Sequence, residues 1–154
     1  MFRLRKAVCL LIVLAWCAMA LPGCRRTPDE VQVREGIASI ARAAEANAAS
    51  DVVAPLSDDF NGNDVDGSAG ELDRRALANM IRLIALRGEH IGVTAGPIAI
   101  EHRGDRMVAT FTVTLSSGSH LLPDQLGVYQ IESAWRNEDG KWRCYTASWK
   151  HAIQ

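Results

Sequence analysis

The chain has 154 residues, of which 48% are hydrophobic, and its 17 Lys and Arg nearly balance its 18 Asp and Glu, giving a formal net charge of −1. This length suits one domain with a single core. The basic side chains do not cluster, which argues against nucleic acid as a partner, because phosphate binding needs clustered Lys and Arg.

The N-terminal segment, residues 1–23, is predicted to be an export signal. Three basic residues within the first six positions precede an uncharged apolar run from Ala7 to Leu21. This run is shorter than the ~20 residues that span a bilayer. Leu21-Pro22-Gly23-Cys24 resembles the end of a bacterial lipoprotein signal, in which the cysteine becomes the lipidated first residue, although Pro22 stands where Ala or Ser is usual. An ordinary signal peptide cut elsewhere, or an uncleaved anchor, is the alternative.

Lipidation of Cys24 would attach the protein to a membrane on the periplasmic side, with residues 24–28 as a tether and residues 29–154 as the folded domain. Enteric bacteria use Asp after the cysteine to retain lipoproteins in the inner membrane. Arg25 stands there instead, so we expect the outer membrane. Cleavage removes three of the 17 basic residues and none of the acidic ones, which leaves 14 against 18, a net charge of −4.

The four cysteines do not indicate a disulfide framework. Cys9 and Cys17 leave with the signal and Cys24 carries the lipid, so only Cys144 remains as a thiol. It lies in an alternating strand pattern, where a free cysteine behaves as a small hydrophobe. A catalytic thiol is the alternative, but no cationic neighbour or helix N-terminus is evident that would activate it.

Two helices are predicted in the first half of the mature chain. The first begins with Thr27 as its N-cap and Pro28 as its first helical residue, and its apolar residues recur at helical spacing. The Asp-, Asn- and Gly-rich residues 57–70 then predict a loop. The second helix runs from about Glu71 to Leu86, and Gly88 ends it. Its apolar stripe is Leu72, Leu77, Met80, Ile81 and Ile84.

The second half is predicted to be a β-meander, because apolar and polar residues alternate over several short runs. The clearest run is Met107 to Leu115, whose Thr residues all fall on one face. A final hairpin turns at Glu138-Asp139-Gly140. The predicted segments are a strand around Ile98 and Ile100, a turn at 103–106, a strand at 107–115, a polar connection at 116–127, and hairpin strands at 129–137 and 141–150.

The length of the hairpin turn decides which residues share a face. A two-residue turn places Arg136 opposite Arg143, which is unfavourable for like charges. A three-residue turn avoids this and sets Arg143 beside Trp135. The sequence leaves both registers open, and we favour the second, which pairs Tyr129 with Trp149. Aromatic residues then lie on both faces, which predicts that the second face meets a pocket, a lid or a partner subunit. One face carries Tyr129, Ile131, Trp135, Tyr145 and Trp149, and the other carries Ala134, Trp142 and Cys144.

Two leading helices, a meander and a hairpin with Trp135-Arg136 and Gly140-Lys141-Trp142-Arg143 resemble the nuclear transport factor 2-like superfamily. Leu56-Ser57-Asp58-Asp59-Phe60 also matches, and the resemblance covers about residues 29–149. It implies a cone-shaped α+β fold, in which two N-terminal helices pack on a curved antiparallel sheet, and a homodimer formed through the sheet. Members include isomerases, cyclases, dehydratases and many non-catalytic binding modules, so the resemblance does not settle activity.

Three polar residues are candidate catalytic groups. Asp58 and Asp59 follow the first helix, where the resemblance implies a carboxylate base, but that helix has no Tyr to act as the companion hydrogen-bond donor. Ordinary turn residues are the alternative. His102 shares strand parity with Ile98 and Ile100, so its side chain could point inward as an acid or base; a structural or exposed histidine is the alternative. Neither a metal site nor a cofactor is predicted, since residues 62–73 fail the calcium-loop pattern at both ends.

We therefore interpret the chain as a membrane-anchored, non-catalytic module that binds a small hydrophobic ligand or a protein partner on the periplasmic side. The predicted pocket or interface residues are Tyr129, Trp135, Tyr145 and Trp149. An enzyme of isomerase, cyclase or dehydratase type and a structural dimer subunit of an envelope assembly are the two alternatives. A deep cavity with an ionisable residue would favour the enzyme, and a cone filled by side chains would exclude it.

Overall fold

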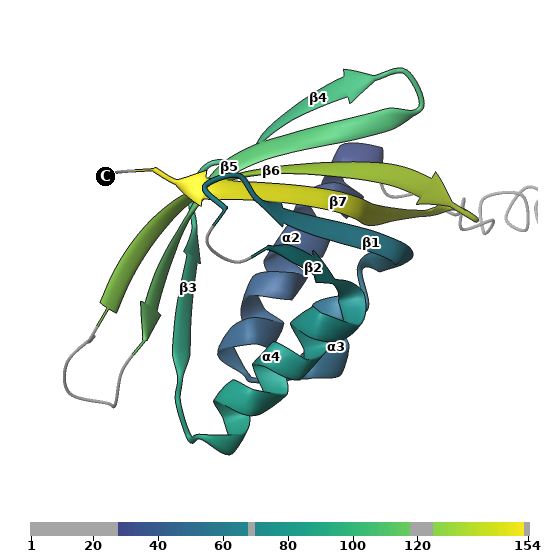
Figure 1. Ribbon diagram of the computed structural model, residues 1–154. Coiled ribbons are helices and arrows are strands. Elements are labelled where there is room, and N and C mark those ends of the chain that lie inside the picture. Colours follow the sequence, from purple (N-terminus) through teal and green to yellow (C-terminus); the bar gives the residue numbers. More distant parts are fainter. Residues whose placement is uncertain (1–27, 68–69, 118–124, 153–154) are drawn as a thin grey trace, which may run out of the picture.

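The computed structural model describes residues 28–67, 70–117 and 125–152. In this part of the chain, helices cover the concave face of one strongly curved sheet (Figure 1). None of the described helices is long and apolar enough to cross a membrane. The predicted signal at 1–23 and Cys24 lie outside the described residues.

Helix α2 (Asp29–Glu45) packs on the sheet through an apolar face. Val33 and Ile37, one turn apart, are buried in the core cluster that includes sheet residues, and Ala43 further along the helix packs in a second cluster with residues of the other helices. The helix begins one residue later than predicted, because Pro28 has an extended conformation and is the N-cap. Thr27, the predicted cap, lies outside the described residues.

Two further helices pack beside α2. The short helix α3 (Ala49–Val53), which the sequence analysis did not predict, buries small apolar residues between α2 and the next helix. Helix α4 (Arg74–Leu86) begins three residues later than predicted, because Asp73 is its N-cap and accepts the Ala76 N–H at 2.6 Å. Gly88, with a φ of 68°, follows the end of α4 as predicted.

The segment predicted as a loop at 57–70 contains a strand and part of its connection to a second one. Strand β1 (Leu56–Asp64) pairs antiparallel with β2 (Glu71–Asp73) and parallel with the last strand of the chain. Buried and exposed residues alternate in the second half of this strand, where Phe60, Gly62 and Asp64 are buried. The alternation is not visible as a hydrophobic pattern, because most of these residues are Asp, Asn or Gly. The loop prediction was wrong because pairing on both sides satisfies the backbone and outweighs the low β-propensity of these residues.

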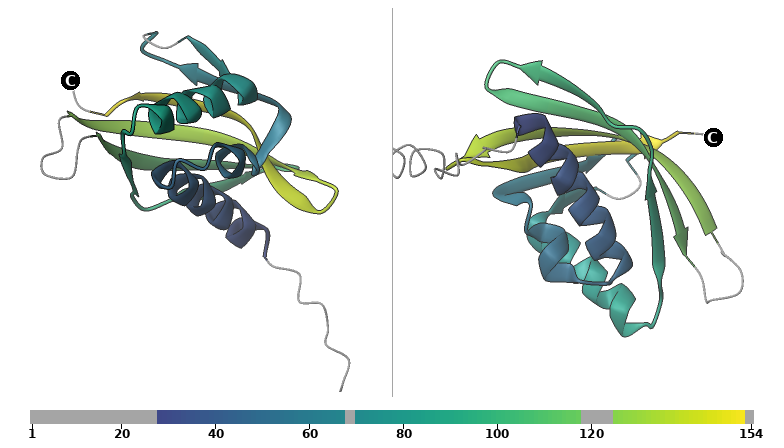
Figure 2. Two further views of the ribbon diagram at one scale, coloured as in Figure 1. Left: turned by 90° about the horizontal axis from the view of Figure 1, so that it is seen from below. Right: turned by 180° about the vertical axis from the view of Figure 1, so that it is seen from behind.

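Five further strands complete the sheet: β3 (Ile91–Ala95), β4 (Ala99–Arg103), β5 (Arg106–Ser117), β6 (Gln125–Glu138) and β7 (Lys141–His151). Within the described residues the sheet order is β2-β1-β7-β6-β5-β3, with β4 also paired to β5. The alternation predicted for 107–115 is confirmed, since Met107, Ala109, Phe111 and Val113 are buried. Figure 2 shows how the bend of the long strands wraps the sheet around the helices. The predicted fold class is therefore confirmed, although β1 makes the sheet mixed.

The hairpin adopts the register that we did not favour. β6 and β7 join through the two-residue turn Asp139-Gly140, with φ values of 51° and 85°, so Arg136 pairs with Arg143. Glu138 offsets these like charges, because its carboxylate lies 2.8 Å from the Arg136 guanidinium and 3.7 Å from that of Arg143. Repulsion between the two arginines was therefore a poor guide to the register.

A β-bulge sets the faces of this hairpin. The register shifts between Ala134 and Trp135, so Trp135 pairs with Cys144 and Tyr145 is the extra residue. Trp135 and Cys144 are 1% and 2% exposed and belong to one core cluster. Tyr145 instead lies beside Arg136 and Arg106, whose guanidinium carbons are 5.2 and 5.9 Å from its ring centroid.

The bulge also changes the predicted aromatic pairs. Tyr129 pairs with His151, and Ile131 pairs with Trp149. Trp142 packs against the same core as Trp135, so the predicted division of aromatic residues between two faces was wrong. The inner face holds most of the aromatic side chains of the hairpin.

Candidate functional site

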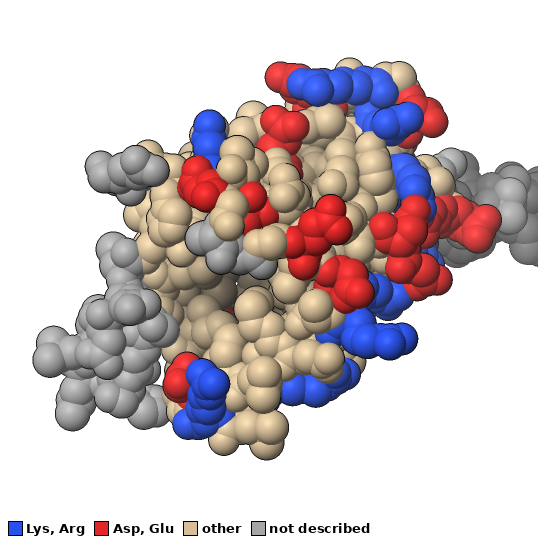
Figure 3. Space-filling view, viewed as in Figure 1, with Lys and Arg blue, Asp and Glu red and all other residues tan. Residues whose placement is uncertain are grey.

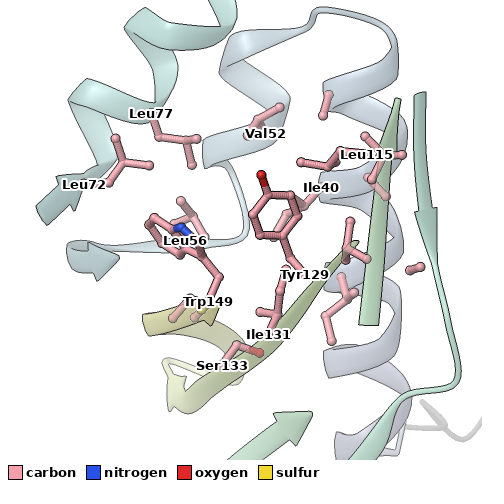
Figure 4. Close-up of a pocket in the computed structure, with 18 of the residues that line it drawn as sticks. Ile40, Val52, Leu56, Leu72, Leu77, Leu115, Tyr129, Ile131, Ser133 and Trp149 are labelled. Carbon is pink, nitrogen blue, oxygen red and sulfur yellow. The ribbon is translucent and has the colours of Figure 1, made fainter. Parts of the chain in front are cut away.

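A cavity of about 530 Å³ lies between the helices and the concave face of the sheet. This volume is within the range of small-molecule sites, roughly 300–1,000 Å³. Its lining is almost entirely aliphatic and aromatic. In Figure 4, Ile40, Val52 and Leu77 from the helices lie across the cavity from the sheet residues Tyr129, Ile131 and Trp149.

Exposure rises along β6 from the closed end of this cavity to its mouth. Trp135 is 1% exposed and Ser133 4%, whereas Ile131 and Tyr129 are half-buried. At the closed end Trp135 Nε1 donates to Ser133 Oγ at 3.0 Å, and Ser133 Oγ donates to the Ala109 carbonyl at 3.4 Å. These polar atoms satisfy one another and do not need a ligand. The surface is hollowed between α4, β2 and β3 (Figure 3).

Three aromatic rings of the lining each rest on a glycine. A Cβ at any of these glycines would lie closer to the ring than real Cβ atoms do, so only glycine leaves room for the ring in its present position. The three glycines therefore leave the space that these rings of the cavity wall occupy. The distance from a Cβ built on the glycine to the nearest ring atom is 2.8 Å for Gly36 and Trp135, 2.8 Å for Gly62 and Trp149, and 2.6 Å for Gly127 and Tyr129.

Polar side chains of the lining gather where β1 and β7 end and β6 begins. Asp64 pairs with Trp149 across the β1–β7 ladder, and Tyr129 pairs with His151 on the next strand. The Tyr129 and His151 ring centroids are 4.5 Å apart, and the Tyr129 hydroxyl points into the cavity (Figure 4). Asp64 is 7% exposed, and its Oδ1 accepts the Asp66 N–H at 3.1 Å. Three neighbouring strands, β1, β7 and β6, thus contribute a carboxyl, an imidazole and a phenol group to a cavity whose lining is otherwise mostly apolar.

Asp64 and His151 are site residues that the sequence did not predict. Asp64 lies in the segment predicted as a loop, and the alternation of buried positions through Phe60 and Gly62 is the signal that could have predicted its inward direction. His151 meets Tyr129 only in the register that follows the bulge at Tyr145. No local pattern of apolar and polar residues reports such a bulge.

Asp58 and Asp59, the predicted catalytic carboxylates, lie on β1 and do not line the cavity. Asp58 forms an ion pair with Arg74. Asp59 accepts the Ser57 hydroxyl at 2.6 Å and lies 2.7 Å from the Arg136 guanidinium. The hydrogen bond from Ser57, followed by that from Arg136, holds the pKa of Asp59 below its usual 3.8. A surface carboxylate kept ionised in this way is a weak base for catalysis at neutral pH.

His102, the third candidate, is exposed on β4. Its Nε2 lies 2.9 Å from Glu30 Oε1 in the first turn of α2. The expected inward direction was wrong, because the half-burial of Ile98 and Ile100 does not continue to this end of β4. The imidazole joins a helix end to a strand end at the surface.

Cys144 lies in the cavity wall with its thiol buried. Burial raises the pKa of this thiol to about 12, and Sγ donates to the Thr146 carbonyl at 3.3 Å. A neutral thiol at the closed end of an apolar cavity is not an activated nucleophile.

The predicted pocket or interface residues are divided by the bulge. Tyr129, Trp135 and Trp149 line the cavity, and Tyr145 lies outside it against Arg106 and Arg136. In the part of the chain that the structure covers, no group of three or more His, Cys, Asp or Glu side chains could hold a metal ion.

Comparison with known proteins identifies the fold. No protein-family model and no curated protein sequence matches the chain. A nuclear transport factor 2-like protein with a cystatin-like fold from Novosphingobium aromaticivorans has a TM-score of 0.64 at 21% identity, over 80% of this chain and 82% of that one. A proposed scytalone dehydratase from the same organism has a TM-score of 0.69 at 13% identity, over 80% and 84%. A proposed dehydratase of the nuclear transport factor 2-like family from Streptomyces avermitilis has a TM-score of 0.65 at 16% identity, over 82% and 98%. The chain therefore has the nuclear transport factor 2-like fold, as the resemblance predicted.

Proposed function

We propose that this protein binds a small hydrophobic molecule in the cavity between its helices and its sheet. The supporting observation is the cavity of about 530 Å³ with an almost wholly apolar lining, which the side chains of the cone leave unfilled. A ligand that buries apolar surface there gains about 25 cal/mol for each Å² removed from water. The aromatic rings that pack against glycines form part of the cavity wall without a ligand, and a preformed wall lowers the entropic cost of binding.

The test fills the cavity without changing the surface. Ala41 of α2 lines the cavity, whereas Ala38 on the same helix is exposed. We expect Ala41→Phe to weaken binding of the neutral dye N-phenylnaphthylamine by about tenfold or more, measured by its fluorescence, because the ring occupies the ligand space. The matched variant Ala38→Phe should bind as the natural chain does. Equal binding by both variants, with unchanged circular dichroism, would exclude the cavity as the site.

The location is part of the same proposal. We infer that Cys24 is lipidated and holds the domain on the periplasmic side, in the outer membrane, which the apolar run before Leu21-Pro22-Gly23-Cys24 supports. Cys24→Ser should abolish palmitate labelling of the full chain and release the protein from the membrane fraction. Cys17→Ser, a change of the same kind within the signal, should leave both unchanged. Membrane retention of Cys24→Ser without label would contradict the proposal.

An enzyme is the second candidate, and Asp64 is the observation that favours it. A buried carboxyl group that lines the same cavity as Tyr129 and His151 could remove a proton from a bound carbon acid. This candidate predicts exchange of deuterium from D2O into a medium-chain methyl ketone, followed by NMR, and loss of that exchange in Asp64→Asn. Absence of exchange above the buffer rate, while the ketone binds, would leave binding as the function.

A further inference from the structure

The apolar surface of helix α4 continues from the cavity onto the outside of the molecule. Leu77 and Ile81 line the cavity, and Met80 lines it too although it is 44% exposed, which places Met80 at the rim. Further along the helix, Leu83 is 54% and Leu86 82% exposed. Met80, Leu83 and Leu86 follow one another at intervals of three residues and form one patch at the cavity rim, the rim patch. Exposed apolar side chains gathered in this way mark an interaction surface.

The charged side chains of α4 and its C-cap are all positive. From Arg74 to Arg87 the chain contains four Arg and neither Asp nor Glu. The nearest acidic residues in sequence, Asp73 and Glu89, lie outside the helix. Blue side chains border an uncharged surface over α4, in the lower part of Figure 3. The rim patch thus lies on a basic amphipathic helix, an element suited to the surface of an anionic membrane.

Most of this positive charge is not neutralised within the described residues. Arg74 forms an ion pair with Asp58. Arg82 donates to a neutral amide oxygen of the same helix at 2.8 Å, which leaves its charge uncompensated. Arg75 and Arg87 are exposed, and neither has an ion-pair partner in residues 28–67, 70–117 and 125–152. A second copy of the chain packed along α4 would bring like charges together, whereas anionic lipid headgroups would offset them, so the charge favours lipid.

We propose that α4 docks on the surface of an anionic phospholipid bilayer, with the rim patch among the headgroups and the arginines beside lipid phosphates. In this position the mouth of the cavity, which is hollowed beside α4, faces the lipid. A hydrophobic ligand then moves between bilayer and cavity over apolar surface without crossing water. Docking does not depend on the lipid anchor, whereas the passage of a ligand rests on the proposed binding function.

Oxidation of Met80 by hydrogen peroxide measures docking in the full chain. After oxidation, trypsin releases residues 76–82, in which Met80 is the one methionine, for mass spectrometry. We expect vesicles of phosphatidylglycerol to slow this oxidation about threefold or more relative to vesicles of phosphatidylcholine, because oxidation follows exposure. Added salt should reduce the protection, because it screens the attraction between arginine and lipid. Met107, which is fully buried, should be oxidised slowly with either lipid.

A matched pair of double variants tests the arginines. Arg75→Gln with Arg87→Gln should remove most of the protection of Met80, because both unpaired charges of α4 are then lost. Arg103→Gln with Lys141→Gln removes the same total charge at exposed positions outside α4 and should leave the protection unchanged. Circular dichroism should be unaltered in both.

Transfer of N-phenylnaphthylamine tests the route of the ligand. The dye is loaded into phosphatidylglycerol vesicles that also carry a quenching lipid, so its fluorescence rises when it enters the full chain. The transfer rate should increase with protein concentration, because contact with the vesicle precedes transfer. Leu83→Gln should slow transfer without changing the dye affinity measured in the absence of vesicles, since Leu83 does not line the cavity. Val31→Gln, at an exposed apolar position of α2, should change neither.

The outcomes separate docking from the proposed function. Equal oxidation of Met80 with the two lipids, or equal effects of the two double variants, contradicts docking on anionic lipid, although dye binding in the cavity stands. Protection that grows with protein concentration without vesicles places a second copy on the rim patch, and the inference fails. If vesicles protect Met80 but the dye does not bind, the proposed function fails and the docking surface remains. If Met80 is protected but Leu83→Gln does not slow transfer, the route of the ligand is wrong.

Discussion

At the scale of single residues, Gly36 shows how one missing side chain shapes the cavity. It lies on α2, and a Cβ there would come within 2.8 Å of the Trp135 ring. Glycine inside a helix ordinarily costs about 0.5–1 kcal/mol relative to alanine. Alanine would not fit at this position, because the Trp135 indole, which closes the end of the cavity, occupies the space that a Cβ would need.

We expect Gly36→Ala to destabilise the protein, although alanine is the better helix former. Overpacking against Trp135 should lower the free energy of unfolding by about 1–3 kcal/mol, measured by urea denaturation. In a Trp135→Phe background the smaller ring leaves room for the methyl group, so the added cost of Gly36→Ala should fall. Equal costs of Gly36→Ala in both backgrounds would show that the contact with the indole is not the cause.

Residues of this kind are hard to predict from sequence. The apolar spacing of Val33 and Ile37 identifies the buried face of a helix, and that prediction was confirmed. The match of Gly36 to Trp135 joins positions about a hundred residues apart in the chain and leaves no periodic signal. The buried carboxylate of Asp64 was missed for a similar reason, because its direction depends on the pairing of β1 with β7.

At the scale of elements, the β6–β7 hairpin is the place where local reasoning failed. Like charges at Arg136 and Arg143 argued against the two-residue turn, yet Asp139-Gly140 supplies the two positive φ angles that this turn requires. Turn chemistry outweighed a surface repulsion that Glu138 offsets. The alternation of β5 was predicted correctly, because a half-buried strand without a bulge keeps one period along its length.

The role of Glu138 can be measured. We expect Glu138→Gln to lower the melting temperature at low ionic strength, because Arg136 and Arg143 then lose the carboxylate between them. Added salt screens the uncovered repulsion, so the loss should shrink as ionic strength rises. Glu132→Gln, at an exposed position of the same strand, is the control and should show little effect. A loss that does not depend on salt would contradict this account.

The register also bears on assembly. A homodimer through the sheet stays a prediction. Of the hairpin's aromatic residues that favoured it, only Tyr145 lies outside the cavity and the core, and it contacts two arginines. The outer face of β5 carries threonines such as Thr112, not an apolar patch. Sedimentation equilibrium of the mature chain would measure the association directly.

At the scale of the whole molecule, the sheet that forms one wall of the cavity brings together strands from the beginning and the end of the domain. β7 lies between β1 and β6, so the first strand along the chain pairs in parallel with the last strand. Parallel pairing over such a separation carries a large loop-closure cost that packing must offset. The cone shape was predicted from a resemblance to a known superfamily. The volume of the cavity inside the cone could not be predicted, because it depends on side-chain packing that the sequence pattern does not report.

We therefore expect a chain that ends at Glu138 to lose its cooperative unfolding transition. Without β7, β1 loses its parallel partner, and the core loses Cys144 and Trp149 from one wall. Circular dichroism during heating would report this as a broad transition without a plateau. A chain that lacks only residues 153–154 should melt as the full chain does. A sharp transition in the shorter chain would show that β7 is dispensable for the fold.

The position of β7 has a consequence for biosynthesis. Until the last strand leaves the ribosome, β1 has no parallel neighbour, and the hydrophobic residues that later face the cavity have no complete core to enter. We expect such a nascent chain to stay unfolded through most of its synthesis, and an unfolded chain is the state that can pass through a narrow translocation channel. If the export proposal holds, the binding chamber closes only after the chain has crossed the membrane. If the binding proposal holds as well, the ligand is acquired in the compartment to which the protein is exported and is not carried there from the cytoplasm.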